Sequence, residues 1–567
     1  MKKNSFYVAF VAVMSVLTLA ACGGLGKMEK HIADLGATAT PEPLEVHGDS
    51  IQLSINGKFP EKYFHKKVVV EATPVLVYQG GESKFEMKGF QGEQAAGNYE
   101  KIPFKTGKGF SYTDKIAFVP GMDTSSLYLN IHGSEGSKVA DFDPYKIGTG
   151  VITTPYLIKG DDKVVSNKDD KYIRVTSFSK KAELNFDYNS SNLKPAELKQ
   201  EDINALVTFL QAEVAANPKI AIKSIEFVAY ASPEGEIFLN DNLANERADA
   251  GKAAFQGMLK KAKMDTTYNK MMSVTAKGED WDGFRSAMEA SAIEDREIIV
   301  RILQKTSDLA AREQEIKNIS KTYTEIQKDI FPSLRRCTVV INYDLNGYTD
   351  AELTALAKSN PSSLKYEELM TAALLTEDMS AKASIYAEAE KKADADFRAS
   401  NNLGVILYNQ NKVADAEAKF NAAYNKSKTD ETNCNMGAVT RLKGDRAGAM
   451  KYLNASNTNE AKYNKGLIDI QNGDYASAVS NMSSYKTFNT SLAKLLNKDN
   501  GGADADMKAS NDTSALADYL RAVICARSND AAGVASNLKS AVQKDSSLAN
   551  KAKKDLEFRN FASALTF

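Results

Sequence analysis

The stretch Phe227–Ala248 reads FVAYASPEGEIFLNDNLANERA and passes from a predicted strand, through a tight turn, into a predicted helix. The apolar run Ile225–Tyr230 is strand-like, and Pro233 and Gly235 interrupt it. After the turn, apolar residues recur at helical spacing. A polar turn at the carboxyl end of a strand, leading into a helix, is a favoured place for a ligand. Arg247 is placed to reach this turn, so its partner is the main question about function.

Length and composition limit the classes of protein to consider. The chain has 567 residues, too many for one hydrophobic core, and this length suggests roughly three or four domains. With 43% hydrophobic and 26% charged residues, the composition is that of a folded protein. The formal net charge is only -1, so no nucleic-acid partner is expected.

Residues 1–21 have the pattern of a lipoprotein signal peptide. Two lysines precede the apolar run Phe6–Leu19, which is too short for a membrane-spanning helix. The sequence Leu19-Ala20-Ala21-Cys22 resembles a bacterial lipobox. That resemblance implies cleavage before Cys22 and attachment of acyl chains, palmitate among them, to its sulfur. An ordinary cleavage site with a chance cysteine is the alternative.

Four segments follow the signal peptide. Residues 22–44 are rich in glycine, alanine and threonine and predict a lipidated tether. Residues 45–165 hold several short β-branched runs with turn signals between them, which predicts a β-sandwich. Residues 180–345 predict an α/β domain with the element order βαβαββ and a helical insertion at 281–333. Residues 350–567 are alanine-rich and predict an all-helical domain.

The helical domain contains an internal repeat. Leu403-Gly404, Ala416 and Phe420 fit the tetratricopeptide pattern of small and large residues on two antiparallel helices, and Met436-Gly437 begins the next copy. Such repeats bind partner proteins on their concave face. The segment Lys498–Thr513 interrupts the repeats and reads as a mobile loop.

The α/β domain resembles the OmpA-type peptidoglycan-binding domain over most of residues 182–343. In that family, a turn contains an aspartate, with a glycine, an asparagine, a leucine and an Arg-Ala pair at fixed distances after it. Gly235, Asn240, Leu243 and Arg247-Ala248 are in register with those positions, and Gly278-Glu279 resembles a later loop of the family. Together with the repeats and the lipobox, the chain is similar to OmpA-family outer-membrane lipoproteins with tetratricopeptide repeats in Bacteroidota.

The resemblance implies a ligand for the turn. In the family, the aspartate and the arginine hold the zwitterionic end of diaminopimelate in the peptidoglycan stem peptide, a pairing suited to a guanidinium and a carboxylate. In this chain Arg247 is kept, but Ser232 stands at the aspartate position. Losing one charged partner commonly costs about 2–5 kcal/mol. Glu234 is a candidate for the missing carboxylate.

Each of these residues also has a purely structural interpretation. Arg247 could cross-link the fold, Asn240 could serve the turn or the helix start, and Glu234 could be a solvated turn residue. Trp281, the single tryptophan, is expected to anchor the insertion. The ligand-binding set that the resemblance implies is Arg247, Asn240, Ser232 and Glu234.

No catalytic constellation is apparent in the sequence. No histidine follows His132, which removes Ser-His and Cys-His chemistry from most of the chain. The sequence contains no P-loop, and the histidines lack metal-ligand spacing. We therefore expect a protein that is not an enzyme and needs neither a metal nor another cofactor.

Two hypotheses about function follow. In the first, the protein is an outer-membrane lipoprotein, anchored through Cys22 and facing the periplasm, that binds peptidoglycan and scaffolds partner proteins through its repeats. Two weak attachments on one chain would reinforce each other. In the second, it is a structural component of an outer-membrane assembly or secretion machine, with a β-barrel complex as a possible partner, and its OmpA-like domain no longer binds peptidoglycan.

Overall fold

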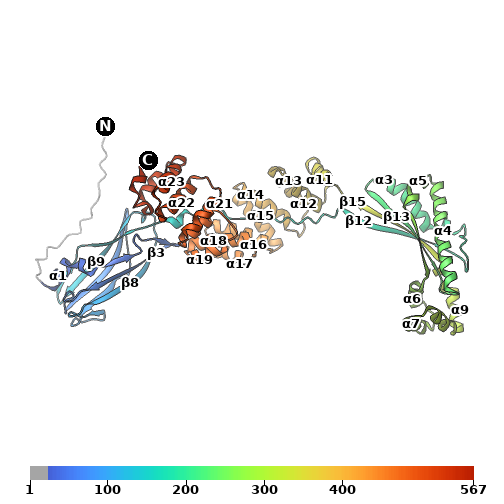
Figure 1. The fold of residues 1–567 in the computed structure, drawn as a ribbon, viewed down its shortest axis with the longest axis horizontal. Coiled ribbons are helices and arrows are strands. Elements are labelled where there is room, and N and C mark those ends of the chain that lie inside the picture. Colours follow the sequence, from blue (N-terminus) through green and yellow to red (C-terminus); the bar gives the residue numbers. More distant parts are fainter. Residues whose placement is uncertain (1–22, 567) are drawn as a thin grey trace. The chain divides into compact units, whose positions relative to one another are not determined.

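The computed structural model describes residues 23–566, apart from the side chains of Asp265 and Thr266. The lipidation prediction at Cys22 lies outside the described residues. The chain forms two compact units (Figure 1). One consists of Met1–Lys168 together with Ala393–Phe567, and the other of Asp169–Lys392.

The first unit begins with two sheets that enclose one core, so the predicted sheet-rich N-terminal region is confirmed. In the long strand Ser50–Phe59, residues Ile51, Leu53 and Ile55 are buried and their neighbours are more exposed, as expected for strand periodicity. The first sheet contains β1 (Thr38–Thr40), β2 (Val46–His47), β3 (Ser50–Phe59) and β8 (Lys108–Ala117). The second contains β4 (Val68–Tyr78), β5 (Gly81–Lys84), β6 (Lys88–Gly92), β7 (Glu100–Ile102), β9 (Ser125–Glu135), β10 (Lys138–Asp141) and β11 (Tyr145–Gly150).

Residues 24–40 are structured, whereas the sequence predicts a tether there. Helix α1 (Gly24–Lys30) and the 3₁₀ turn η1 (Ile32–Leu35) precede strand β1. Leu25, Met28 and Leu35 are buried in the sandwich core. These three apolar side chains provide the burial that makes this short segment pack rather than remain extended in solvent.

The second unit is built on a four-stranded sheet with the order β12-β15-β13-β14. Strands β13 and β14 are parallel, and the other pairs are antiparallel. Helix α2 packs against β12, and helix α4 packs against β13 and β14. Figure 1 shows α4 beside the sheet. Phe227 and Phe255 meet in the core. The strands are β12 (Val175–Asn185), β13 (Ile220–Ala231), β14 (Met272–Glu279) and β15 (Arg336–Asn346). The helical elements are η3 (Glu197–Lys199), α2 (Glu201–Thr208), the π-helical turn η4 (Phe209–Glu213), α3 (Val214–Ala216), α4 (Ile237–Lys261), α5 (Asp265–Tyr268) and η5 (Asn269–Met271).

Five helices lie between β14 and β15 and form their own small core around Phe284 and Phe331. Trp281 packs edge-on against Phe284, consistent with its expected anchoring role. The five helices are α6 (Trp281–Ala290), α7 (Arg296–Lys305), α8 (Leu309–Lys317), α9 (Ser320–Asp329) and α10 (Phe331–Leu334). Helical elements after β15 complete the second unit: α11 (Asp350–Ser359), η6 (Pro361–Ser363), α12 (Tyr366–Leu375) and α13 (Met379–Lys391).

The predicted helical repeats are confirmed in the first unit, where consecutive helices pair (Figure 1). A Cβ atom added to Gly404 would lie 2.7 Å from Phe420, and one added to Gly437 would lie 2.4 Å from Leu453. Glycine is therefore needed where the two helices of these two pairs touch. The pairs are α14 (Arg398–Asn409) with α15 (Val413–Lys426), α16 (Asp430–Leu442) with α17 (Arg446–Asn454), α18 (Asn459–Asn472) with α19 (Tyr475–Asn481), α20 (Phe488–Leu496) with α21 (Asn500–Ala509), and α22 (Ala515–Arg527) with α23 (Ala531–Lys544); α24 (Leu548–Lys554), η7 (Leu556–Phe558) and η8 (Ala562–Leu565) follow.

The prediction of a mobile loop at Lys498–Thr513 is wrong. Helix α21 occupies most of this segment and buries Ala503 and Met507 against α20. Asp499 caps the helix by accepting a hydrogen bond from the amide of Gly502. The cap and the buried face compensate for the low helix propensity of the two glycines.

Candidate functional site

The predicted ligand turn joins β13 to α4 and brings its four candidate residues together. Gly235 has a φ of 102°, a conformation that glycine adopts readily. Ser232, Glu234, Asn240 and Arg247 are all buried, with at most 6% of each residue exposed. A solvated role for Glu234 is therefore excluded, and each polar group needs a partner inside the protein.

Arg247 finds its partners in the main chain. Its Nε donates to the carbonyl oxygen of Ser190 at 3.0 Å, and its two terminal nitrogens donate to the carbonyl oxygens of Tyr230 (3.0 Å) and Asp187 (3.1 Å). Burial lowers the pKa of Arg247 to about 10; nearby Arg335 lowers it as well, while Glu234 opposes the shift. The guanidinium thus ties the end of β13 to the loop after β12.

Glu234 turns inward but pairs with a different arginine. Arg335 donates to its Oε1 from Nε at 3.0 Å and from a terminal nitrogen at 2.7 Å. The hydroxyl of Ser232 donates to the same oxygen at 2.6 Å. The candidate carboxylate is therefore held by Arg335 and Ser232.

The insertion and the end of β14 contact this turn. The amide of Gly235 donates to the carboxylate of Glu313 on α8 at 2.6 Å. Asn240 Nδ2 donates to Glu279 at 2.8 Å, and the Trp281 indole donates to the other oxygen of Glu279, also at 2.8 Å. Burial raises the pKa of Glu279, while the hydrogen bonds from Asn240 and Trp281 oppose the shift. The Gly235 amide and the Asn240 side chain thus already have acceptors within the protein.

A second candidate site lies along the repeats and was not predicted from the sequence. Residues 159–167, here called the groove segment, run beside the first helices of the repeat pairs without belonging to a sheet. Four buried asparagines each bind one residue of this segment through both its amide and its carbonyl group. The pairs are Asn489 with Lys159, Asn464 with Lys163, Asn435 with Val165, and Asn402 with Asn167, at 2.7–3.0 Å.

These asparagines, here called the asparagine ladder, occupy equivalent positions in successive pairs. Asn402, Asn435 and Asn464 each stand two residues before the glycine at which the paired helices touch, and Asn489 stands two residues before Ser491. Their exposure is 1% or less. The recurrence of Asn-x-Gly at 402–404, 435–437 and 464–466 was the available signal in the sequence, whereas the fourth position, Asn489, is evident only with α20 aligned as a repeat.

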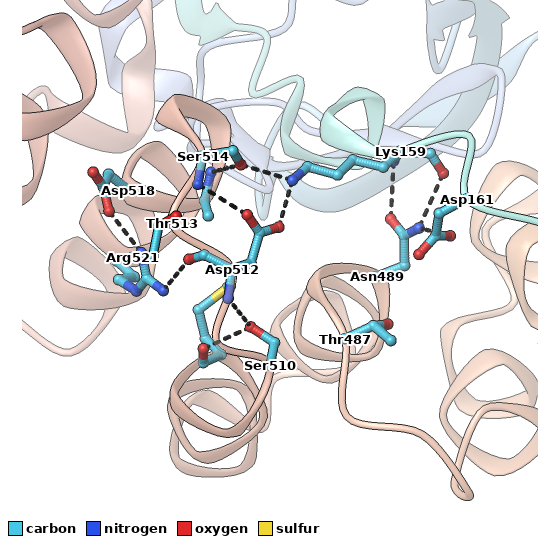
Figure 2. Close-up of polar contacts among 12 residues, drawn as sticks. Lys159, Asp161, Thr487, Asn489, Ser510, Asp512, Thr513, Ser514, Asp518 and Arg521 are labelled. Atoms are coloured by element: carbon cyan, nitrogen blue, oxygen red, sulfur yellow. Dashed lines mark hydrogen bonds and ion pairs between the residues drawn. The ribbon is translucent and has the colours of Figure 1, made fainter. Parts of the chain in front are cut away.

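Charged side chains of the groove segment have partners as well. The carboxylate of Asp162 accepts hydrogen bonds from two guanidinium nitrogens of Arg441, and both side chains are at most 5% exposed. Figure 2 shows Lys159, whose Nζ lies 2.5 Å from Asp512 and donates to Ser514 at 2.8 Å. The same ammonium lies over the ring of Phe488, 4.4 Å from its centroid.

Neither a membrane-spanning helix nor a metal-binding cluster occurs in the described residues. Between residues 23 and 566, no helix is both long and apolar enough to cross a bilayer. In the same part of the chain, no three histidine, cysteine, aspartate or glutamate side chains are grouped to hold a metal ion.

Two solved structures are similar in fold to parts of the chain. A tetratricopeptide repeat protein from Parabacteroides merdae has 13% identity and a TM-score of 0.28, covering 38% of this chain and 91% of its own. The APC/C hetero-tetramer Cut9-Hcn1 has 12% identity and a TM-score of 0.30, covering 59% and 77%. No protein-family model and no curated protein matches the sequence. At these TM-scores, the repeat assignment depends on the helix pairs themselves.

Proposed function

We propose that the protein is a non-enzymatic scaffold of the cell envelope, anchored to the outer membrane by lipid on Cys22, whose repeats hold extended polypeptide. The α/β domain serves as a structural module within a larger assembly and does not bind the peptidoglycan stem peptide. The anchor and the envelope location rest on the lipobox sequence at residues 19–22.

One observation carries this choice between the two hypotheses. The guanidinium of Arg247, the cation that would grip the ligand carboxylate, is fully buried and donates to three carbonyl oxygens of its own chain. Because the guanidinium is buried, a carboxylate of diaminopimelate would reach it only if the turn opened and disturbed these hydrogen bonds, which would leave buried carbonyl groups without donors. The carboxylate that would bind the ligand ammonium already pairs with Arg335.

Cosedimentation with purified peptidoglycan sacculi tests the proposal. We expect the full chain to remain in the supernatant, with or without free diaminopimelate. A Glu313→Ala variant, which removes the insertion's contact with the turn but keeps Arg247, should behave in the same way. Sedimentation that diaminopimelate competes away, and that a folded Arg247→Lys variant loses, would establish the peptidoglycan-binding hypothesis instead.

A further inference from the structure

The asparagine ladder recognises polypeptide backbone. Lys163, Val165 and Asn167 are two residues apart, so in an extended chain their N–H and C=O groups face the same side. Each of these residues donates its amide to an asparagine Oδ1 and accepts a hydrogen bond from the Nδ2 of the same asparagine. Such pairing resembles the addition of a strand to a sheet edge, in which the main chain supplies affinity whatever the side chains are.

Side chains of the repeats add selectivity at two positions. Arg441 forms two hydrogen bonds to Asp162 in an almost fully buried pair. This geometry favours a carboxylate at the position of Asp162 and disfavours a lysine there. Asp512, Ser514 and the ring of Phe488 surround the ammonium of Lys159, as Figure 2 shows for the polar partners. The groove therefore favours an extended peptide with a lysine three residues before an aspartate.

The groove segment is also reachable from solvent. An open groove of about 760 Å³ runs beside Gly160–Val164 and is lined on the repeat side by residues that include Tyr408, Leu442 and Tyr485. A competing peptide would have a path along the segment without passing through the protein core.

We propose that the repeats form a binding groove for an extended peptide carrying lysine and aspartate three residues apart, and that residues 159–167 occupy this groove as an internal ligand. A partner peptide with the same chemistry binds by displacing them. The inference rests on the proposed scaffold function, because it names what the repeats hold. A tethered segment competes at an effective concentration on the order of millimolar, so the intact chain is closed to weak external peptides.

The test uses the full chain and a fluorescein-labelled synthetic peptide of residues 157–168, with binding measured by anisotropy. In one variant, Lys159→Ala and Asp162→Ala weaken the internal segment. We expect this variant to bind the peptide at least tenfold more tightly than the wild type. Adding Asn435→Ala and Asn464→Ala should abolish binding, whereas adding Asn425→Ala, an exposed asparagine on α15, should leave it unchanged.

The opposite results overturn the inference. If the weakened variant retains the helical circular dichroism of the wild type and binds no better, the groove does not accept peptide in trans. Binding that survives loss of both asparagines would place the peptide elsewhere. If the variant with Lys159→Ala and Asp162→Ala unfolds, Lys159→Ala alone, at the partly exposed end of the segment, replaces it. The same two results, no tighter binding or binding that survives loss of both asparagines, would then overturn the inference. Cosedimentation with sacculi tests only the α/β domain, whereas the anisotropy experiment tests only the repeats. Failure of the proposed function and failure of this inference can therefore be told apart.

Discussion

Arg247 illustrates how one side chain serves either a ligand or the fold. Its three hydrogen bonds join two carbonyl groups of the loop after β12 to the end of β13. A guanidinium suits this arrangement because its donors are fixed in a planar fork. The guanidinium that binds a ligand in the resembled family thus links two segments of the α/β domain in this chain.

Replacing Arg247 by lysine should weaken the second unit. A lysine keeps the charge but cannot supply three donors in the same plane, and each buried carbonyl without a donor costs about 1–3 kcal/mol. We expect the free energy of unfolding to fall by about 2–4 kcal/mol, measured by urea denaturation with hydrogen exchange reporting on β13 and α4. The matched control is Arg301→Lys, at an exposed position on α7, which should change stability little. Equal stability of the Arg247→Lys and Arg301→Lys variants would contradict a structural role for Arg247.

Asp512 gives a pH dependence with a defined sign. Burial alone raises its pKa, but hydrogen bonds from Lys159 and from the amide and hydroxyl of Ser514 outweigh burial and bring the pKa to about 2, below its ordinary 3.8. Because the folded value is the lower one, ionised Asp512 stabilises the fold above pH 3.8, and this contribution is lost as the pH falls toward 2.

The wild type should therefore lose stability more steeply than an Asp512→Asn variant across that pH window. Urea unfolding at a series of pH values measures the difference between the two proteins, so that other titrating carboxylates cancel. Parallel curves for the two proteins would show that the contact between Lys159 and Asp512 does not persist in solution.

At the scale of the elements, the repeat pairs depend on small residues at the helix crossings. In α16, a Cβ at position 437 would lie within 2.5 Å of two atoms of Leu453. Overpacking of this kind typically costs about 1–3 kcal/mol, so Gly437→Ala should destabilise the repeats by that amount. Gly501→Ala on α21, where a Cβ would meet nothing within 4 Å, should be neutral or stabilise by up to about 1 kcal/mol. Thermal unfolding monitored by circular dichroism compares the two, and a neutral Gly437→Ala would contradict the close packing.

Apolar periodicity and residue spacing predicted which helices and strands form better than they predicted what those elements pack against. The strand around Phe227, the helix after Gly235 and the repeats beginning at Gly404 and Gly437 carry clear apolar patterns, and each forms. Helix α21 was missed because its glycines and aspartates mimic a loop, while its cap and its buried Met507 become evident only with α20 beside it.

The contacts of the site were harder to predict than its residues, because the partners are far apart in the sequence. Spacing placed Ser232, Glu234, Asn240 and Arg247 around one turn, and the structure brings them together. The partners of the turn lie far away in the sequence. Arg335, which binds Glu234, follows it by about one hundred residues, and Glu313, which binds the Gly235 amide, belongs to the insertion. Likewise, the groove segment and Asn402 are separated by 235 residues, so no local pattern relates them.

At the scale of the whole molecule, the binding groups of each candidate site are occupied by other residues of the same compact unit. In the α/β unit, Arg335 and Glu313 occupy the groups around the turn. In the other unit, residues 159–167 bind the repeats through main-chain and charged contacts. The segment that follows the two sheets is thus bound by helices much later in the chain, and the sheets, the segment and these helices belong to one compact unit.

Amide hydrogen exchange of the groove segment in the intact protein tests this central claim most directly. We predict that the amides of Lys163 and Val165 exchange about 100-fold more slowly than in an unstructured peptide, since each must first break its hydrogen bonds to Asn464 or Asn435. The Asn435→Ala and Asn464→Ala double variant should lose this protection, whereas Asn425→Ala should keep it. Wild-type amides that exchange at the rate of an unstructured chain would contradict an occupied groove.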